Sequence, residues 1–172
     1  AGTPLAALHD ELAEHAQHVS LDAARIAEGA TVGGLLATAD AGPAALVFGS
    51  LRDLVIGVTL VLADGTVARA GGHVIKNVAG YDVAKVVHGS YGTLAVMTHV
   101  TLKTLPAPEK ACTVLLFDLE PRAAWDAMTR ALASHFDVSA AAYLPRPIAR
   151  RLAVPYLEDT SVTALRLEGT AR

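Results

Sequence analysis

Glycines with small polar neighbours are the residues of this chain best suited to bind a ligand. One group is Gly33-Gly34 with Thr31 before it and Thr38 after it, and the other is the turn Gly89-Ser-Tyr-Gly92. Glycine lets a ligand approach the main chain, and N–H groups bared at a turn or a helix start can hold an anion. The pattern therefore indicates an anion site, with tight packing of a helix on a sheet as the alternative for Gly33-Gly34.

Other reactive side chains lack the partners that a catalytic or metal site needs. His15 and His18 are three residues apart, but they fall at the end of an expected helix and no third metal ligand is evident. Cys112 lies in an apolar run, which favours a buried thiol. No Ser/His/Asp order and no suitable pair of carboxylates is present. We therefore assign no metal site, and the catalytic residues stay unknown.

Several charged residues have two interpretations each. Lys76, followed by Asn77, lies in an apolar and glycine-rich stretch, and it is either a surface lysine or a cation at a binding site. Arg52 and Asp53 either pair with each other at the surface or face a cofactor. Three arginines could bind a carboxylate, although solvated helix charges explain them more simply: Arg146, Arg150 and Arg151.

Short helices and a hairpin must position the first glycine group. The spacing predicts a helix from Leu5 to about His15, with Thr3 as its cap and Pro4 at its first position, and a second helix capped by Thr31. A hairpin follows, in which residues 55–62 and 66–70 flank a two-residue Asp64-Gly65 turn with positive φ.

The second glycine group lies between a short helix and a strand. We expect a helix over 83–87 that is capped by Asp82, has its apolar residues inward and stops at Gly89. The strand over 93–105 is rich in β-branched residues, and period-two alternation places four of them on one face: Val96, Thr98, Val100 and Leu102.

Pro106-Ala-Pro108 marks a boundary, after which the pattern changes. Residues 114–118 are typical of a strand, residues 121–135 of a helix, and residues 138–143 and 163–167 of further strands. Strand, helix and strand in this order predict half of a split βαβ sandwich. Such a piece leaves an apolar face uncovered, so we expect an exposed patch or a partner across it.

Composition excludes several classes of protein. Of the 172 residues, 52% are hydrophobic and 18% are charged, which suits one substantial core or two small ones. A net charge of −3 argues against nucleic acid or an anionic membrane as the main partner. The longest apolar run is too short to span a membrane, and we expect a cytoplasmic protein. Because the chain opens on Ala-Gly-Thr-Pro, we expect a processed or truncated piece.

Two motifs resemble a known family. The run Lys76-Asn-Val-Ala-Gly-Tyr-Asp-Val83 and the run Gly89-Ser-Tyr-Gly-Thr-Leu94 are similar to the second half of the FAD-binding domain in flavoproteins of the vanillyl-alcohol oxidase type, also called PCMH-type FAD-linked oxidases. Within them, the chain looks most like the FAD-binding subunits of bacterial glycolate oxidases. The resemblance runs from the first residue to Pro106 and is weaker beyond.

The resemblance implies an α+β fold and a cofactor. Residues 1–108 would be the C-terminal part of a PCMH-type FAD-binding domain, an antiparallel sheet with flanking helices, and residues 109–172 part of a ferredoxin-like substrate cap. FAD would oxidise a small 2-hydroxyacid, glycolate or D-lactate, and a second flavin subunit and an iron–sulfur subunit would be partners. The implied FAD contacts are Thr31, Gly33, Gly34, Thr38, Gly42, Asp53, Lys76, Asn77, Gly92 and Val96.

The resemblance also limits what this chain can do by itself. In the family, one FAD-binding subdomain precedes the matching region and the histidines of the catalytic site follow it, so we expect the chain alone to be inactive. The alternative is a non-enzymatic module that docks with other subunits and binds no flavin. A Rossmann oxidoreductase is disfavoured because the Gly-x-Gly-x-x-Gly fingerprint is missing.

Overall fold

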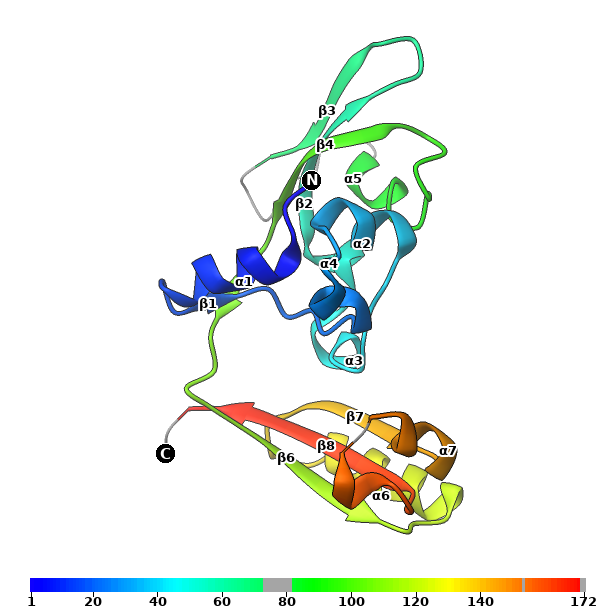
Figure 1. The fold of residues 1–172 in the computed structure, drawn as a ribbon. Helices are drawn as coiled ribbons and strands as arrows, with labels where there is room; N and C mark the ends of the chain where they lie inside the picture. Colours follow the sequence, from blue (N-terminus) through cyan, green and yellow to red (C-terminus); the bar gives the residue numbers. More distant parts are fainter. Residues whose placement is uncertain (73–81, 153, 171–172) are drawn as a thin grey trace. The chain divides into compact units, whose positions relative to one another are not determined.

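The computed structural model describes residues 1–72, 82–152 and 154–170 (Figure 1). The chain divides into two compact units, Ala1–Ala107 and Pro108–Arg172, and each is described by itself. Both units are α+β, with antiparallel sheets and helices beside them, as the sequence predicted.

The first unit is built from short helices beside a small sheet. Its helices in chain order are α1 (Leu5–Ala13), η1 (Ala24–Glu28), α2 (Val32–Thr38), α3 (Ala45–Phe48), α4 (Leu51–Leu54) and α5 (Val83–Val86). Strand β2 (Val55–Val61) lies between β3 (Val67–Gly71) and β4 (Val96–Leu102), and both neighbours are antiparallel to it. The two-residue strands β1 (Gln17–His18) and β5 (Leu105–Pro106) form a separate pair.

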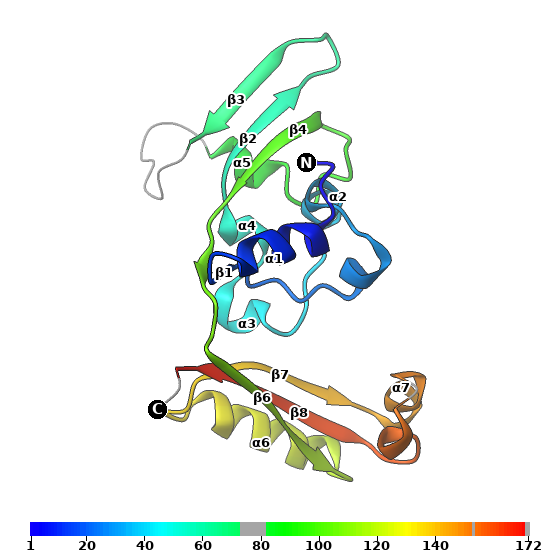
Figure 2. The ribbon, with the colours of Figure 1, turned by 60° about the vertical axis from the view of Figure 1, so that its left-hand side comes forward.

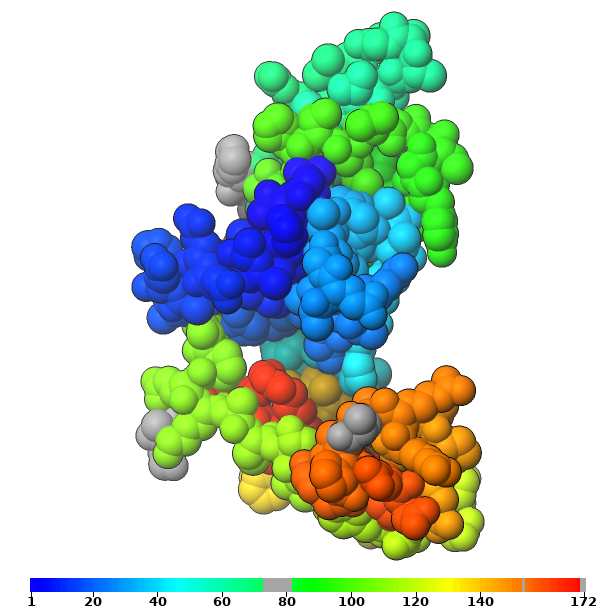
Figure 3. Space-filling view, viewed as in Figure 1, coloured from blue at the N-terminus to red at the C-terminus, as the bar shows by residue number. Residues whose placement is uncertain are grey.

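The core of this unit lies between α1, α2, α4 and the sheet. Because β2 is the central strand, Val55, Val58 and Leu60 are buried, and they pack with Leu35 and Leu36 of α2. Figure 3 shows the N-terminal residues lying against those of η1 and α2, where the backbone N–H of Gly33 donates to the carbonyl of Ala1 at 2.8 Å. The first residues therefore hold the start of α2 in place.

Strand β4 does not keep the predicted face. The register between β2 and β4 shifts between Thr59 and Leu60, so that the alternation changes phase along β4. Met97 packs against the core, whereas Val96 is 65% exposed. The shared face predicted for Val96, Thr98, Val100 and Leu102 is therefore wrong at its first half, because an irregularity in pairing cannot be seen in a period-two pattern.

The β2–β3 hairpin forms as predicted, but its turn is longer. Leu62 and Thr66 close the loop, with the Leu62 N–H donating to the Thr66 carbonyl at 2.9 Å. Of the loop residues, only Gly65 has a positive φ, of 84°. The Asp64 carboxylate accepts a bond from the Thr66 N–H at 2.9 Å, which lowers the pKa of Asp64. The connection is thus a three-residue loop over 63–65, with the left-handed conformation at one glycine.

Two predicted helix caps do not form. Pro4, not Thr3, occupies the N-cap position of α1, and no side chain caps that helix. Asp82 precedes α5 but makes no capping bond, and its carboxylate lies 3.9 Å from the ammonium of Lys85. Within α5, Ala84 is buried while Val86 is exposed, so only part of the short helix faces inward.

The second unit is a three-stranded sheet with a helix on one face (Figure 2). Strand β8 (Val162–Gly169) lies between β6 (Lys110–Phe117) and β7 (Val138–Leu144), and α6 (Pro121–Leu132) connects the two outer strands. This is the split βαβ arrangement that the sequence predicted. Short segments complete the unit: α7 (Arg146–Ala149), η2 (Arg150–Leu152) and η3 (Pro155–Leu157).

Cys112 lies on β6, a strand at the edge of this sheet. Cys112 is exposed, not buried as its apolar neighbours suggested, because β6 pairs with a strand on one side only among the described residues. Arg146, Arg150 and Arg151 lie on α7 and η2, and their binding of a carboxylate stays a prediction.

Candidate functional site

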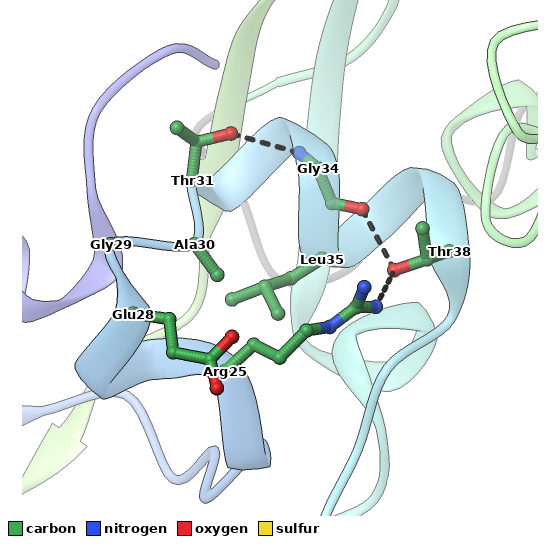
Figure 4. A pocket seen from close by; sticks show the side chains of 8 residues that line it. All are labelled: Arg25, Glu28, Gly29, Ala30, Thr31, Gly34, Leu35 and Thr38. Atoms are coloured by element: carbon green, nitrogen blue, oxygen red, sulfur yellow. Dashed lines mark hydrogen bonds between the residues drawn. The ribbon is translucent and has the colours of Figure 1, made fainter.

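A pocket of about 270 Å³ lies beside α2 in the first unit (Figure 4). Its lining brings together three of the residues implied as FAD contacts, which are Thr31, Gly34 and Thr38. The other lining residues were not predicted from the sequence, and they are Arg25, Glu28, Gly29, Ala30 and Leu35. The site is therefore formed by one face of α2 and by η1 with the residues that follow it.

Thr31 caps α2, as the sequence predicted. Its hydroxyl accepts a hydrogen bond from the Gly34 N–H at 3.1 Å, and its carbonyl accepts from the Leu35 N–H at 2.9 Å. The N–H of Val32 donates to the Thr3 carbonyl at 3.0 Å, and that of Gly33 to the Ala1 carbonyl. The first amides of α2 therefore all have acceptors within the protein.

This hydrogen bonding bears on the anion site that the sequence indicates at Gly33-Gly34. A helix start whose N–H groups are occupied cannot give them to a phosphate without breaking the bonds to Ala1, Thr3 and Thr31. Gly33 is buried, and a Cβ there would lie 2.9 Å from the Cβ of Ala1. The packing alternative thus accounts for Gly33 in this structure, and the contact of Gly33 and Gly34 with a cofactor stays a prediction.

The charged groups of the pocket are arranged around Thr38. The Arg25 guanidinium lies 3.1 Å from an Asp40 carboxylate oxygen and donates to the Thr38 hydroxyl at 3.5 Å. That hydroxyl in turn donates to the Gly34 carbonyl at 2.9 Å (Figure 4). Glu28 adds a negative charge to the lining. Arg25 is the cation that could hold an anion here, and it is already paired with Asp40.

The Gly89–Gly92 turn lies beside the C-terminal end of α2. The Gly89 N–H donates to the Leu36 carbonyl and the Tyr91 N–H to the Ala37 carbonyl, both at 2.9 Å. Gly92 has a φ of 73°, and no heavy atom lies within 4 Å of a Cβ built there. Within the described part of the chain, no acceptor pairs with its N–H. Among the described residues, Gly92 thus has the open space and the unpaired N–H that the sequence analysis expected at this turn.

Two other implied contacts have structural roles. Gly42 lies against Asp22, so closely that a Cβ would overlap the Asp22 carboxylate and carbonyl. Asp53 is the third residue of α4, which leads directly into β2, and it forms a capping box with Ser50, whose N–H donates to the Asp53 carboxylate at 2.9 Å. Their contact with a cofactor stays a prediction.

Of the remaining implied contacts, the structure describes Val96. Val96 is exposed on β4, outside the pocket lining. Lys76 and Asn77 lie outside the described residues. The structure therefore brings together Thr31, Gly34 and Thr38, with the Gly92 turn at the far end of the same helix.

A second group of titratable residues lies where α4 meets α5. Lys85 donates from its ammonium to the Arg52 carbonyl at 2.9 Å. The His88 Nε2 atom is buried without a hydrogen-bond partner. Burial of this ring, and the positive charge of Arg52, lower the pKa of His88, while Asp53 opposes the shift. No local pattern in the sequence predicts that Lys85 and His88 lie close to Arg52 and Asp53, which belong to a separate segment of the chain.

The lowered pKa of His88 predicts a loss of stability in acid. Because the unfolded chain takes up this proton first as the pH falls below 6.5, unfolding becomes easier from that pH down to the folded pKa. Above 6.5 the ring is neutral in both states and contributes no slope. Urea unfolding at about pH 7.5 and about pH 5.5 should show a smaller loss for His88→Gln than for the unchanged chain. An equal loss in both would contradict this role of His88.

The described residues were also compared with what a metal site and a membrane-spanning helix require. No group of three or more His, Cys, Asp or Glu side chains there could hold a metal ion, and the His18 Nε2 atom instead lies 2.6 Å from the Ser20 hydroxyl. Among the same residues, no helix has the length and apolar character to cross a bilayer.

Comparison with known proteins relates the first unit to flavin-binding proteins. A family model described as an FAD binding domain matches residues 1–71. Glycolate oxidase subunit GlcE of Escherichia coli (strain K12) is 41% identical over 107 residues, which cover 62% of this chain and 31% of that protein. A D-lactate dehydrogenase of Archaeoglobus fulgidus is 46% identical over 80 residues, or 46% of this chain and 18% of that protein.

A solved structure supports the fold over almost the whole chain. Alkyldihydroxyacetonephosphate synthase superposes with a TM-score of 0.73 over 96% of this chain and 33% of that chain, at 18% sequence identity. The chain spans less than a third of the length of the curated relatives described above, at 31% and 18%. The chain is thus related to FAD-linked oxidases and dehydrogenases of 2-hydroxyacids, and its residues 1–71 match part of their FAD-binding domain.

Proposed function

We propose that this chain is part of an FAD-dependent oxidoreductase subunit that acts on a 2-hydroxyacid, with glycolate or D-lactate as candidate substrates. The observation that carries the proposal is the 41% identity over 107 residues with a glycolate oxidase subunit. The FAD-binding model matches residues 1–71, which all belong to the first unit. By itself, the chain turns no substrate over.

In this proposal the first unit supplies one wall of the FAD site. The amides at the start of α2 are occupied, so the wall uses the N–H of Gly92, which has no acceptor among the described residues, and the open space beside it. Thr38 and Arg25 line the pocket on α2 and would orient polar groups of the cofactor. When bound, FAD would accept the two electrons that the 2-hydroxyacid loses on becoming a 2-oxoacid. None of the described residues is assigned to catalysis.

The two units would then have different tasks. Residues 1–108 are proposed as the C-terminal part of the FAD-binding domain, and residues 109–172 as part of a ferredoxin-like cap over the substrate. The split βαβ order of β6, β8 and β7 supports the second assignment. A second flavin subunit and an iron–sulfur subunit are the proposed partners, because one relative is named as a glycolate oxidase subunit.

A non-enzymatic docking module is the second candidate. Large apolar side chains of the first unit are exposed on α3, on the Gly89–Gly92 turn and at the start of β4, and they are Leu46, Val47, Tyr91, Leu94 and Val96. An uncovered apolar surface of this kind suits contact with another protein as well as contact with a flavin. The two candidates differ in whether the chain binds FAD.

Titration with FAD separates the two candidates. We expect the chain to quench flavin fluorescence on binding FAD, and we expect Gly92→Ala to weaken the affinity about tenfold or more, since an added methyl at a close contact costs about 1–3 kcal/mol. Isothermal titration calorimetry would give both dissociation constants.

Gly65→Ala is the matched control for this experiment. Gly65 has a φ of 84° and equally open surroundings, so its alanine variant has similar backbone strain, in a hairpin loop outside the pocket lining. Its affinity for FAD should stay unchanged. If the folded chain does not bind FAD at all, the docking module is favoured. If both variants bind FAD like the unchanged chain, FAD does not contact Gly92.

A further inference from the structure

The short strands β1 and β5 hold the end of the first unit in place. They pair antiparallel, with Gln17 opposite Pro106. The Ala107 N–H extends the pairing by donating to the Ala16 carbonyl at 2.8 Å. Ala107 is also the last residue of the first unit, and Figure 2 shows this segment of the chain running past β1. The β1–β5 pair therefore fixes the chain at the point where it leaves the first unit.

Strand β1 is the fixed side of this pair, because it is tied to the rest of the first unit. Val19, which follows it, is buried in the core of that unit. The His18 ring packs edge-on against Phe48 of α3, with ring centroids 6.5 Å apart. Ala16, which precedes β1, has a φ of 52°, a conformation that persists in a residue other than glycine only where its surroundings impose it. The N–H of Ala16 donates to the Ala13 carbonyl at 3.1 Å, while its own carbonyl is presented to the β5 side.

Strand β5 is paired through a short and exposed set of contacts. Beside it, the Thr104 hydroxyl donates to Gln17 Oε1 at 3.1 Å, and this bond is exposed. Short surface pairings of this kind open locally without unfolding the rest of a structure. The sequence also favours the closed state, because Leu105 and Ala107 each precede a proline, which biases both toward extended backbone. The pair is therefore prepared to form and is still able to open.

The connector to the second unit is short while this pair is closed. Ala107 is bonded to Ala16, and β6 begins at Lys110. Between them lie Pro108, whose ring fixes φ, and Glu109. Few backbone torsions in this connector can therefore change.

Opening of the pair would lengthen the connector. The next anchored residue toward the N-terminus is Lys103, whose N–H donates to the Leu54 carbonyl at 2.8 Å. Without the β1–β5 pair, the connector would consist of residues 104–109 instead of residues 108–109. A longer connector lets two domains reorient, which is their usual behaviour unless something restrains them.

We propose that the β1–β5 pair is a clamp that sets whether the two units of the chain move as one body or independently. The closed clamp leaves a connector of residues 108–109, and the open clamp leaves one of residues 104–109. The proposal rests on the pairing within the first unit and on the length of the connector, and it does not depend on FAD. In the proposed enzyme, residues 109–172 belong to the substrate cap, so the clamp would limit the movement of that cap. This consequence alone rests on the proposed function.

Charge substitutions at the exposed contact between Gln17 and Thr104 test the clamp in the full chain. Gln17→Glu with Thr104→Glu places like charges there, and Gln17→Glu with Thr104→Lys is the matched control with opposite charges. We expect the like-charge variant to lower the hydrogen-exchange protection of the Ala107 N–H about fivefold or more relative to the control. Backbone NMR relaxation should give one rotational correlation time for both units in the control. In the like-charge variant it should give shorter values that differ between the units.

A disulfide that locks the clamp provides the second test. Because the Ala107 N–H bonds to the Ala16 carbonyl, the neighbouring Gln17 and Pro106 form a non-hydrogen-bonded pair, whose Cα atoms lie about 4.5 Å apart and within disulfide range. In a Cys112→Ser background, Gln17→Cys with Pro106→Cys should therefore form a disulfide within one chain on mild oxidation. The oxidised chain should keep one correlation time for both units.

Three results would overturn the proposal. The first is a pair of units that tumble independently although the disulfide has formed. The second is a like-charge variant in which the Ala107 N–H loses protection while both units keep one correlation time. The third is a like-charge variant whose Ala107 N–H is as well protected as in the opposite-charge control, because the clamp would then not be closed by this contact.

Discussion

Replacing Gly71 with alanine is expected to destabilise the first unit by about 3 kcal/mol, from a strained φ and a steric overlap together. Gly71 ends β3 with a φ of 74°, in the left-handed region that favours glycine. A Cβ there would overlap the Ile56 carbonyl oxygen and lie 2.8 Å from the Gly57 Cα. Those atoms are backbone of β2, the central strand, so they cannot move without disturbing both neighbouring strands.

The control for Gly71→Ala is Gly65→Ala in the same hairpin. Gly65 has a φ of 84°, and nothing lies within 4 Å of its Cβ position. Only backbone strain remains, and the expected loss is about 1 kcal/mol. Urea unfolding, with amide hydrogen exchange of β2 as the local readout, would measure both. Equal losses in the two variants would mean that the overlap at Ile56 is relieved without cost.

The elements that were predicted well depend on local patterns. The β2–β3 hairpin, the Thr31 cap and the strand, helix, strand order after Pro108 follow from alternation, capping residues and turn residues that lie next to each other in the chain. The capping box of Ser50 and Asp53 carries the same kind of local signature, although the sequence analysis interpreted Asp53 as a cofactor contact or as a surface partner of Arg52.

The parts that could not be predicted depend on contacts between distant segments. Ala1 accepts the N–H of Gly33, and Asp22 fills the space beside Gly42, so these glycines pack against other parts of the chain. The β4 irregularity arises from pairing with β2, and a single strand's pattern does not encode its partner's register. Three of the eight residues that line the candidate site were therefore recognisable, namely Thr31, Gly34 and Thr38, whereas the Arg25–Asp40 pair beside them was not.

Truncating Leu36 to alanine is expected to destabilise the first unit by about 3 kcal/mol, as is usual for a leucine lost from a packed core. Leu36 is 0% exposed and belongs to the cluster that joins α2 to β2. Its carbonyl also accepts the Gly89 N–H at 2.9 Å, which attaches the Gly89–Gly92 turn to the end of α2. A cavity beneath α2 should therefore loosen the turn as well as lower the free energy of unfolding.

Leu46→Ala is the control for Leu36→Ala, because it removes a leucine side chain of the same size from an exposed position. Leu46 is 67% exposed on α3, so its truncation should change the stability by less than about 0.5 kcal/mol. If FAD contacts Gly92 as proposed, Leu36→Ala should also weaken FAD binding, while Leu46→Ala should not. This comparison is made without urea, at a pH and temperature where both variants are folded. Urea unfolding and FAD titration of the two variants measure both consequences. A destabilised Leu36→Ala chain with unchanged FAD affinity would show that the turn keeps its position without this packing, and the cofactor wall would then depend on the turn's own conformation.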